Sequence, residues 1–290
     1  MTVCAVIVTY QPYLSEVQSS LAKLRPQVDA IVLVDNASLG PLREGLRGLA
    51  VEFRCHLIEN AANLGIAEAL NQAVRYASAQ HAKFVLFFDQ DSGTSPDFVT
   101  QQLACYRAAS QHARVGLVAP TILRRSDHTR DRPVCLRNGR IILAQTSGAL
   151  MPLAVFDDVG LFRADLFIDY VDYEHCLRMF TKGWQIAYAE AAELDHMPGN
   201  GTSVQFLGRT IHTVGAAPLR HYYETRNCLW VVTHHFRSSP EMTTRLLLRM
   251  VYTHLRALLL EPDRRAKLTA GLQGAFDALR GRLGVCRDEA

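Results

Sequence analysis

No uninterrupted apolar run in this 290-residue chain approaches the roughly 20 residues that a membrane-spanning helix needs. The seven cysteines are odd in number, and no two of them are separated by two residues, which favours free thiols in a reducing cytosol over a disulfide framework or a zinc site. A formal net charge of only +3 argues against nucleic acid as the main partner. The sequence also begins without a basic leader or a small-residue cleavage site, so we expect no signal peptide and a cytoplasmic location.

Short, continuous apolar runs are common in the first part of the chain. Apolar residues make up 49% of the sequence and charged residues 20%, so a packed core is expected. The clearest runs are residues 3–8, 31–34, 84–88 and 115–119. Continuous rather than alternating apolarity indicates strands that are buried on both faces, and residues with helical spacing lie between the runs. The sequence therefore predicts an α/β fold, with a Rossmann-like, mostly parallel sheet flanked by helices.

Strand signals fade after about residue 218, and the remainder of the sequence has helical character. We therefore divide the chain into an α/β domain, residues 1–215, and a C-terminal helical region, residues 216–290.

Polar residues follow each of the first predicted strands. Thr9 and Tyr10 end the first apolar run, Asp35 and Asn36 the second, and the triplet 89–91 (Asp-Gln-Asp) the run at 84–88. In open α/β sheets, ligands bind at the carboxyl ends of the strands. Two carboxylates one residue apart can approach a hard divalent cation and the diphosphate that it bridges. A solvated turn, or a polar cluster before the next helix, remains the alternative for this triplet.

A family resemblance appears when these motifs are taken in order. Thr9-Tyr10, Asp35-Asn36, Asn63-x-Gly65 and the 89–91 triplet resemble the nucleotide-binding half of family 2 glycosyltransferases with the GT-A fold. Residues 166–178 resemble the acceptor-side segment that carries the catalytic aspartate, and together with residues 219–227 they resemble bacterial rhamnosyltransferases of O-antigen, polysaccharide and rhamnolipid synthesis. The match covers roughly residues 3–240. Gln11 and Val171 depart from the Asn and Glu that are usual in the family.

The resemblance implies that residues 1–215 are the catalytic domain, with a donor half at about 1–115 and an acceptor half at about 116–215. It also implies an inverting transfer of L-rhamnose from dTDP-L-rhamnose to a hydroxyl group of a glycan or glycolipid. Asp172 is the expected catalytic base, with Asp169 and Glu174 as alternatives. Mg2+ or Mn2+ is expected at Asp91 and His196, although His196 could equally be a structural loop residue. The expected donor-binding residues are Thr9, Tyr10, Asp35, Asn36, Asn63, Gly65, Asn71, Asp89, Gln90 and Arg226. The expected acceptor-binding residues are Asp169, Glu174, Arg178, Ser147 and Gly148.

Three of these assignments have simpler structural interpretations. Asn63 could cap the helix that begins near Gly65, with Asn71 further along it. Asp35 could form an Asx turn, and Arg226 could be an ordinary surface charge on a helix. Asp35 is nevertheless expected near the thymine, where its carboxylate can accept the N3 proton of the base.

The stretch 246–260 is rich in leucine and carries Arg249 and Arg256, with Arg245 just before it. A basic, apolar helix suits peripheral contact with the inner face of the cytoplasmic membrane, where a lipid-linked saccharide or glycolipid acceptor would lie. Packing on the catalytic domain, or a homo-oligomer interface, is the alternative.

Three other functions compete with rhamnosyl transfer. The same fold could use another nucleotide sugar such as a UDP-hexose, or bind nucleotide sugars without catalysis. A nucleotide-sugar pyrophosphorylase is disfavoured, because no glycine-rich phosphate loop follows the first predicted strand.

Overall fold

A computed structural model describes residues 2–124, 129–136, 138–196, 202–206, 209–213 and 215–286; for Arg124, His196 and residues 202–213 it describes only the backbone. The chain falls into two compact units. The sheet unit comprises residues 1–164 and 172–197, and the helical unit comprises residues 165–171 and 198–290. Within the described residues, no helix is both long enough and apolar enough to cross a lipid bilayer.

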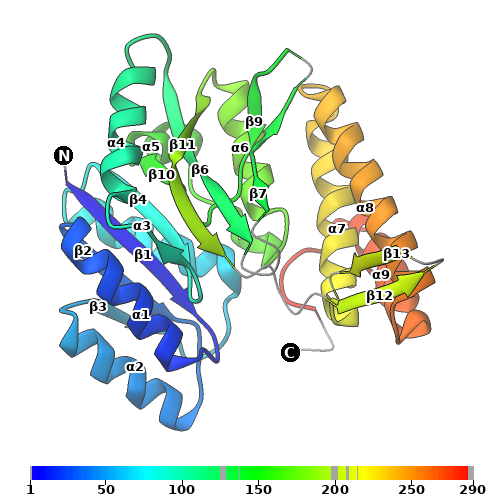
Figure 1. The fold of residues 1–290 in the computed structure, drawn as a ribbon. Helices are drawn as coiled ribbons and strands as arrows, with labels where there is room; N and C mark the ends of the chain where they lie inside the picture. Colours follow the sequence, from blue (N-terminus) through cyan, green and yellow to red (C-terminus); the bar gives the residue numbers. More distant parts are fainter. Residues whose placement is uncertain are drawn as a thin grey trace. The chain divides into compact units, whose positions relative to one another are not determined.

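The sheet unit is built on a mixed sheet that has nine strands in the described part of the chain (Figure 1). Four neighbouring strands are parallel, β10 runs antiparallel between β4 and β6, and β11 returns parallel to β6. The order across the sheet is β3 (His56–Glu59), β2 (Ala30–Asp35), β1 (Val3–Thr9), β4 (Phe84–Asp89), β10 (Leu150–Pro152), β6 (Val115–Arg124), β11 (Gln185–His196) and β5 (Gly93–Thr94), with β7 (Arg130–Asp131) on β6. A separate ribbon pairs β8 (Val134–Cys135) with β9 (Ile141–Leu143). The α/β class expected from the apolar runs is confirmed.

Helices cover both faces of this sheet. They are α1 (Leu14–Leu24), α2 (Gly40–Glu52), α3 (Gly65–Ala79), α4 (Phe98–Ala109), α5 (Ala154–Val159) and α6 (Val171–Thr181), with 3-10 turns at Arg25–Gln27 and Ala164–Leu166. Side chains alternate along each strand. Phe88 therefore packs against Phe98 of α4, with ring centroids 5.8 Å apart, whereas Phe87 faces Phe162 on the other side, at 5.6 Å. The continuous apolar runs are strands buried on both faces, as predicted.

The register of the parallel strands brings their carboxyl ends to one edge. Thr9 of β1 pairs with Asp35 of β2, and Val8 pairs with Asp89 of β4. The polar residues that follow these strands in the sequence are therefore neighbours in space, and they form the starting point for the candidate site.

The helical unit contains three long helices and a hairpin: α7 (Pro218–His235), α8 (Pro240–Leu260), α9 (Arg264–Leu279), β12 (Thr202–Phe206) and β13 (Arg209–Thr213). Helix α9 lies so close to α7 that a Cβ atom on Gly274 would be 2.3 Å from the carbonyl oxygen of Tyr222. The segment 165–171 belongs to this unit, where the ring of Phe167 stacks on Tyr223 at a centroid distance of 5.1 Å. The C-terminal helices are confirmed, and the domain boundary at residue 215 stays a prediction.

Candidate active site

Hydrogen bonds tie together the loops that follow β1, β2 and β4. The backbone N–H of Tyr10 donates to Oε1 of Gln90 over 2.9 Å, and that of Gln11 donates to Oγ of Ser38 over 3.0 Å. Gln11 and Ala37 have left-handed backbone angles, with φ of 48° and 73°. Such conformations cost non-glycine residues about 1 kcal/mol or more, so the surrounding bonds must hold them. The loops at this edge of the sheet are therefore held together by hydrogen bonds between them.

Thr9 and Asp35 form the floor of this edge, and both are fully buried. The two carboxylate oxygens of Asp35 accept the backbone N–H of Ser38 over 3.1 and 3.2 Å, and Nε of Arg43 lies 3.5 Å away. The carboxylate therefore closes a turn onto the N–H three residues on, one residue further than in an Asx turn. Asp35 braces the loop in this structure instead of presenting an open carboxylate to a base, so its direct contact with thymine stays a prediction.

A network of amides lies beside this floor. Nδ2 of Asn36 donates to Oδ1 of Asn63 over 2.7 Å, and Oδ1 of Asn36 accepts from Nδ2 of Asn60 over 3.1 Å. Oδ1 of Asn63 also accepts the N–H of Gly65 over 3.0 Å, while Leu64 occupies the N-cap position itself. Sequence reasoning missed Asn60 and its partner Gln72, because lone amides in a loop and on a helix carry no recognisable spacing.

The Asp89-Gln90-Asp91 turn lies where β4 gives way to β5. All three side chains are half-buried, and the N–H of Ser92 donates to the carbonyl of Asp89 over 3.2 Å. β5 pairs with β11 so that Gly93 faces Asp195, and β11 ends one residue later at His196. The backbone thus brings the end of β11 to this turn, although the side chain of His196 lies outside the described part of the structure. Two carboxylates at a strand end fit a hard divalent cation.

Asp172 lies in the first turn of α6, and its Oδ1 accepts the N–H of Tyr173 over 2.8 Å. Aromatic contacts place this helix against β4. The ring of His175 lies 4.7 Å from Phe162, and Phe162 lies 5.6 Å from Phe87, two residues before Asp89. The start of α6 is thereby packed over the strand that carries the aspartate turn. A helix N-terminus also favours the negative charge that a carboxylate base needs.

Comparison with known proteins identifies the family. The sequence model described as glycosyl transferase family 2 matches residues 3–158. The dTDP-rhamnosyl transferase RfbF of Shigella flexneri is 33% identical over 239 residues, which cover 77% of this chain and 77% of that protein. The chain belongs to glycosyl transferase family 2. The resemblance drawn from the strand-end motifs is confirmed, and this family 2 protein is a glycosyltransferase.

Solved structures show that this family 2 glycosyltransferase has the GT-A fold. S. aureus TarS 1–349 in complex with UDP-GlcNAc matches with a TM-score of 0.63 at 15% identity, over 97% of this chain and 82% of that one. The mannosyltransferase PcManGT from Pyrobaculum calidifontis, in complex with GDP-Man and Mn2+, matches with a TM-score of 0.59 at 18% identity, over 96% and 75%. Similarity at these identities concerns the fold alone.

Two residues expected at the acceptor of this family 2 enzyme brace α6. Glu174 is buried and accepts Nε of Arg178 with both carboxylate oxygens, over 2.8 and 2.9 Å. The guanidinium of Arg178 also donates to the carbonyls of Val159 and Leu161, over 2.7 and 2.8 Å. These bonds fasten α6 to the chain that leaves α5. The structure shows Glu174 and Arg178 holding α6 in place. Their expected contacts with the acceptor, and Glu174 as an alternative base, stay predictions.

Asn71 fastens the same loop from the opposite side. Its amide exchanges two hydrogen bonds with the backbone of Phe162, each 2.9 Å long. Asn71 is 2% exposed and both polar atoms of its amide are hydrogen-bonded, so it supports the loop in this structure; its expected contact with the donor stays a prediction. Burial is the main cause that lowers the pKa of the adjacent His175 to about 3, and Arg178 adds to the effect, so this ring is neutral at pH 7.

Ser147 and Gly148, expected near the acceptor, are also buried packing residues. Oγ of Ser147 lies 3.2 Å from Oγ of Ser92. Gly148 has a φ of +72°, and a Cβ atom there would lie 2.7 Å from Cγ of Pro120. Close packing and a left-handed backbone explain this glycine without a ligand.

Arg226 and Asp169 lie in the helical unit. Arg226 is 1% exposed, and its guanidinium donates to the carbonyls of Leu166 and Gly284, over 3.1 and 2.6 Å. These contacts hold segment 165–171 in place, and the expected role of Arg226 at the diphosphate stays a prediction. Asp169 forms an ion pair with Arg220 at 2.6 Å. Burial raises the pKa of Asp169, and Arg220 opposes that rise.

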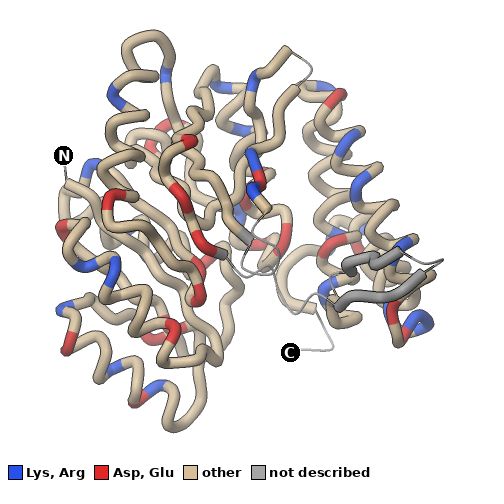
Figure 2. The backbone as a smooth tube through the Cα atoms, in the orientation of Figure 1, with Lys and Arg blue, Asp and Glu red and all other residues tan. Residues whose placement is uncertain are grey.

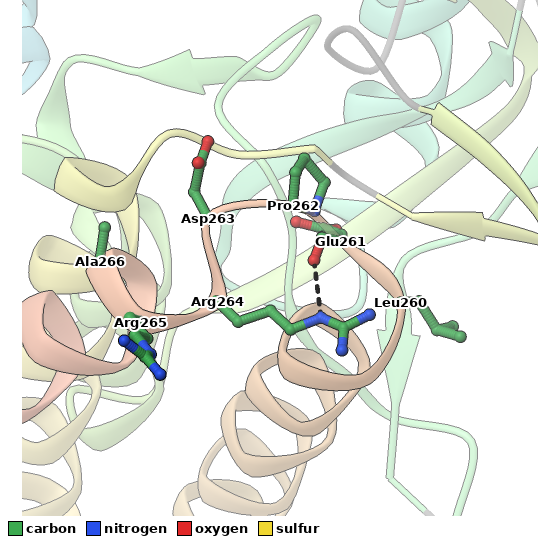
Figure 3. A pocket seen from close by; sticks show the side chains of 7 residues that line it. All are labelled: Leu260, Glu261, Pro262, Asp263, Arg264, Arg265 and Ala266. Atoms are coloured by element: carbon green, nitrogen blue, oxygen red, sulfur yellow. Dashed lines mark hydrogen bonds between the residues drawn. The ribbon is translucent and has the colours of Figure 1, made fainter.

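A surface hollow of about 560 Å³ lies at the turn between α8 and α9, lined by residues 260–266 (Figure 3). Two of its charged side chains, Arg264 and Glu261, have partners within the protein. Arg264 donates to the carbonyls of Glu261 and Leu259, and the carboxylate of Glu261 binds Lys267 at 2.6 Å. The hollow lies in the helical unit and contains none of the strand-end residues, so it is not the donor site.

Proposed function

We propose that this glycosyltransferase transfers L-rhamnose from dTDP-L-rhamnose to a hydroxyl group of a glycan or glycolipid, with inversion at the anomeric carbon. The similarity to dTDP-rhamnosyl transferase RfbF carries the proposal. That match spans 239 residues and is therefore longer than the stretch 3–158 that defines the family. A relative that is similar well beyond the donor half supports a shared donor and a shared reaction type.

The donor would bind along the braced strand edge. The base would lie over Thr9 and the 35–38 loop, and the exposed ring of Tyr10 offers a stacking surface. The Asn36–Asn63 amide pair borders the space for the ribose. Asp91 would hold Mg2+ or Mn2+, which when bound neutralises charge on the departing diphosphate, and Asp89 would face the diphosphate.

Asp172 would act as the base. Single displacement needs one group to take the acceptor hydroxyl proton while the oxygen attacks the anomeric carbon and the diphosphate leaves from the opposite face. Asp172 is half-buried at the start of α6, and the Glu174–Arg178 pair and Asn71 hold that helix and the preceding loop in place. The retention of a fixed carboxylate here supports catalysis over simple nucleotide-sugar binding.

The acceptor would be presented at a membrane surface. Along α8, an exposed apolar stripe recurs at helical spacing, with 43–66% exposure at each position: Leu248, Val251, Tyr252, Leu255 and Leu259. Basic residues recur along the same helix (Figure 2), and the sequence shows that all of them are arginines, at positions 245, 249 and 256. Apolar groups flanked by cations suit an anionic lipid surface. The double variant Leu248→Ser/Leu255→Ser should reduce co-sedimentation with anionic vesicles. Unchanged lipid binding together with loss of a dimer in ultracentrifugation would instead identify an interface between copies.

A donor panel tests the proposed reaction. The purified full-length chain is melted with Mg2+ or Mn2+ and dTDP-rhamnose, UDP-glucose, UDP-galactose or GDP-mannose, and each donor is also tested with EDTA. We expect the largest metal-dependent rise in melting temperature with dTDP-rhamnose. NMR of the product should then show the inverted anomeric configuration. Selective stabilisation by a UDP-hexose, or a product with retained configuration, would overturn the proposal.

A further inference from the structure

A second group of potential metal ligands lies within the helical unit, apart from the aspartate turn. His221 and Glu224 are one turn apart on α7, and His254 comes from α8. One ligand atom from each residue lies within 4.8 Å of the other two. The two imidazole rings meet edge to face, with centroids 4.8 Å apart.

His221 is buried without hydrogen bonds. It is 2% exposed, and within the described residues neither of its ring nitrogens has a hydrogen-bond partner. A buried polar atom left unsatisfied costs about 1–3 kcal/mol, so native structures seldom retain one without a reason. Burial first, and then the charges of His254 and Lys267, lower the pKa of His221 to about 4. The ring is therefore neutral at pH 7 and has a nitrogen lone pair available.

His254 is oriented as metal-binding histidines are. Its Nδ1 lies 2.9 Å from the carbonyl oxygen of Met250, which can only accept, so Nδ1 carries the proton. Nε2 then presents its lone pair, at present toward the hydroxyl of Thr225 at 2.9 Å. A backbone carbonyl that fixes the tautomer in this way is the usual outer partner of a histidine ligand.

The charges around the cluster balance. Arg220 is paired with Asp169 at 2.6 Å, and Lys267 is paired with Glu261 at 2.6 Å. Burial raises the pKa of Glu224 to about 7; the charge of Asp169 adds to this rise, and Arg249 opposes it more than Arg220 does. A cation bound beside Glu224 would favour the charged carboxylate and so offset the cost of burying it.

We propose that His221, Glu224 and His254 form a binding site for Zn2+ that fastens α7 to α8. Two imidazole nitrogens and one carboxylate are a known three-residue zinc ligand set, which leaves a fourth position for water. Zinc bonds of about 2.0–2.1 Å place tetrahedral ligands roughly 3.3 Å apart, so the ligand atoms must approach one another by up to about 1.5 Å. This nitrogen-rich set differs from the oxygen ligands of the aspartate turn, which suit Mg2+ or Mn2+.

The test uses the full chain in excess Mg2+, which occupies oxygen-rich sites and competes poorly for imidazole. Zinc bound per chain is measured by mass spectrometry after equilibration and desalting, and the affinity by calorimetry. We expect one Zn2+ per chain, and a melting temperature several degrees higher with zinc. His254→Gln and Glu224→Gln should weaken binding at least tenfold and abolish that rise. His234→Ala, at an exposed position on α7, is the matched control and should bind like the wild type.

Cobalt substitution guards against variants that fail to fold. Co2+ bound to the wild-type chain should give the intense visible bands of tetrahedral coordination, without a thiolate charge-transfer band from the free cysteines. An octahedral spectrum, a thiolate band, no zinc retained by the wild type, or equal zinc binding by the Gln variants would each overturn the proposal.

Discussion

Asn227 holds segment 165–171 in an unfavourable backbone conformation, and replacing Asn227 should lower the stability of the protein. Phe167, Asp169 and Tyr170 all have left-handed angles, with φ between 63° and 67°. At about 1–2 kcal/mol each, this conformation costs roughly 3–6 kcal/mol in total. The buried Nδ2 of Asn227 lies within 2.6–3.0 Å of the carbonyls of residues 166, 168 and 169. Without that donor, we expect residues 167–170 to move toward more favourable backbone angles.

Asn227→Leu preserves the size of the side chain and removes the donor. The substitution removes two donations from Nδ2 and the bond of 2.9 Å that Oδ1 accepts from Nε of Arg226, and these three lost hydrogen bonds cost about 3 kcal/mol. At roughly 2–4 °C per kcal/mol, the melting temperature should fall by about 6–12 °C. Because the segment leads directly into α6, we also expect kcat to fall about tenfold, with the KM for the donor little changed.

Scanning calorimetry gives the melting temperature of each variant. Initial rates at 20 °C, measured with a soluble acceptor analogue, give kcat and KM. Thr233→Ala, an exposed substitution on the same helix, serves as the control and should melt with the wild type. If Asn227→Leu melts within 1 °C of the wild type and keeps its kcat, the tether has no energetic importance and the reasoning fails.

Three further predictions concern the sheet unit. Asp91→Ala should remove most turnover and weaken donor binding, and chelation of the metal from the wild type should do the same. Full activity of the wild type in excess EDTA would contradict the metal dependence. Asp172→Asn keeps the shape but cannot take a proton, so kcat should fall by ~10²-fold or more at unchanged donor affinity. If the Asp172→Asn variant is active and the Asp169→Asn variant is inactive, the catalytic base is Asp169 and the assignment of Asp172 is wrong. The pKa of His175 is lowered to about 3 from 6.5, so the unfolded chain takes up a proton between these values and stability falls as the pH drops below 6.5. His175→Gln, which can still donate to the Gly160 carbonyl, should show a smaller loss of urea midpoint between pH 7.5 and pH 5, and an equal loss would refute that origin.

The sequence was sufficient to predict the strands of the donor half and their polar ends. Residues 3–8, 31–34 and 84–88 form strands because a doubly buried strand needs an unbroken apolar run, and parallel pairing then aligns the ends. The position of β10 between β4 and β6 was not predictable, because a strand of three residues is too short for its sequence pattern to indicate which strands it pairs with.

The roles of individual polar residues were harder to predict. Asn71, Glu174 and Arg226 carry the groups that a ligand site needs, but the same groups bind backbone carbonyls and amides equally well. Only the fold shows which partner each one meets. Segment 165–171 illustrates this, since its partners on α7 follow some 50 residues later in the chain.

At the proposed donor site, the alignment of Thr9 with Asp35, and of Val8 with Asp89, limits how this enzyme can acquire a new donor. Sliding one strand by a single position would move each of its side chains to the opposite face of the sheet and disrupt the packing on both faces. Adaptation must then proceed through the exposed or half-buried positions of the three short loops, residues 10, 11, 13, 37, 90 and 91, where a substitution alters the rim with least effect on the interior. Natural variation in sugar preference, or a laboratory library selected for it, should accumulate in these three loops while the strands behind them stay unchanged.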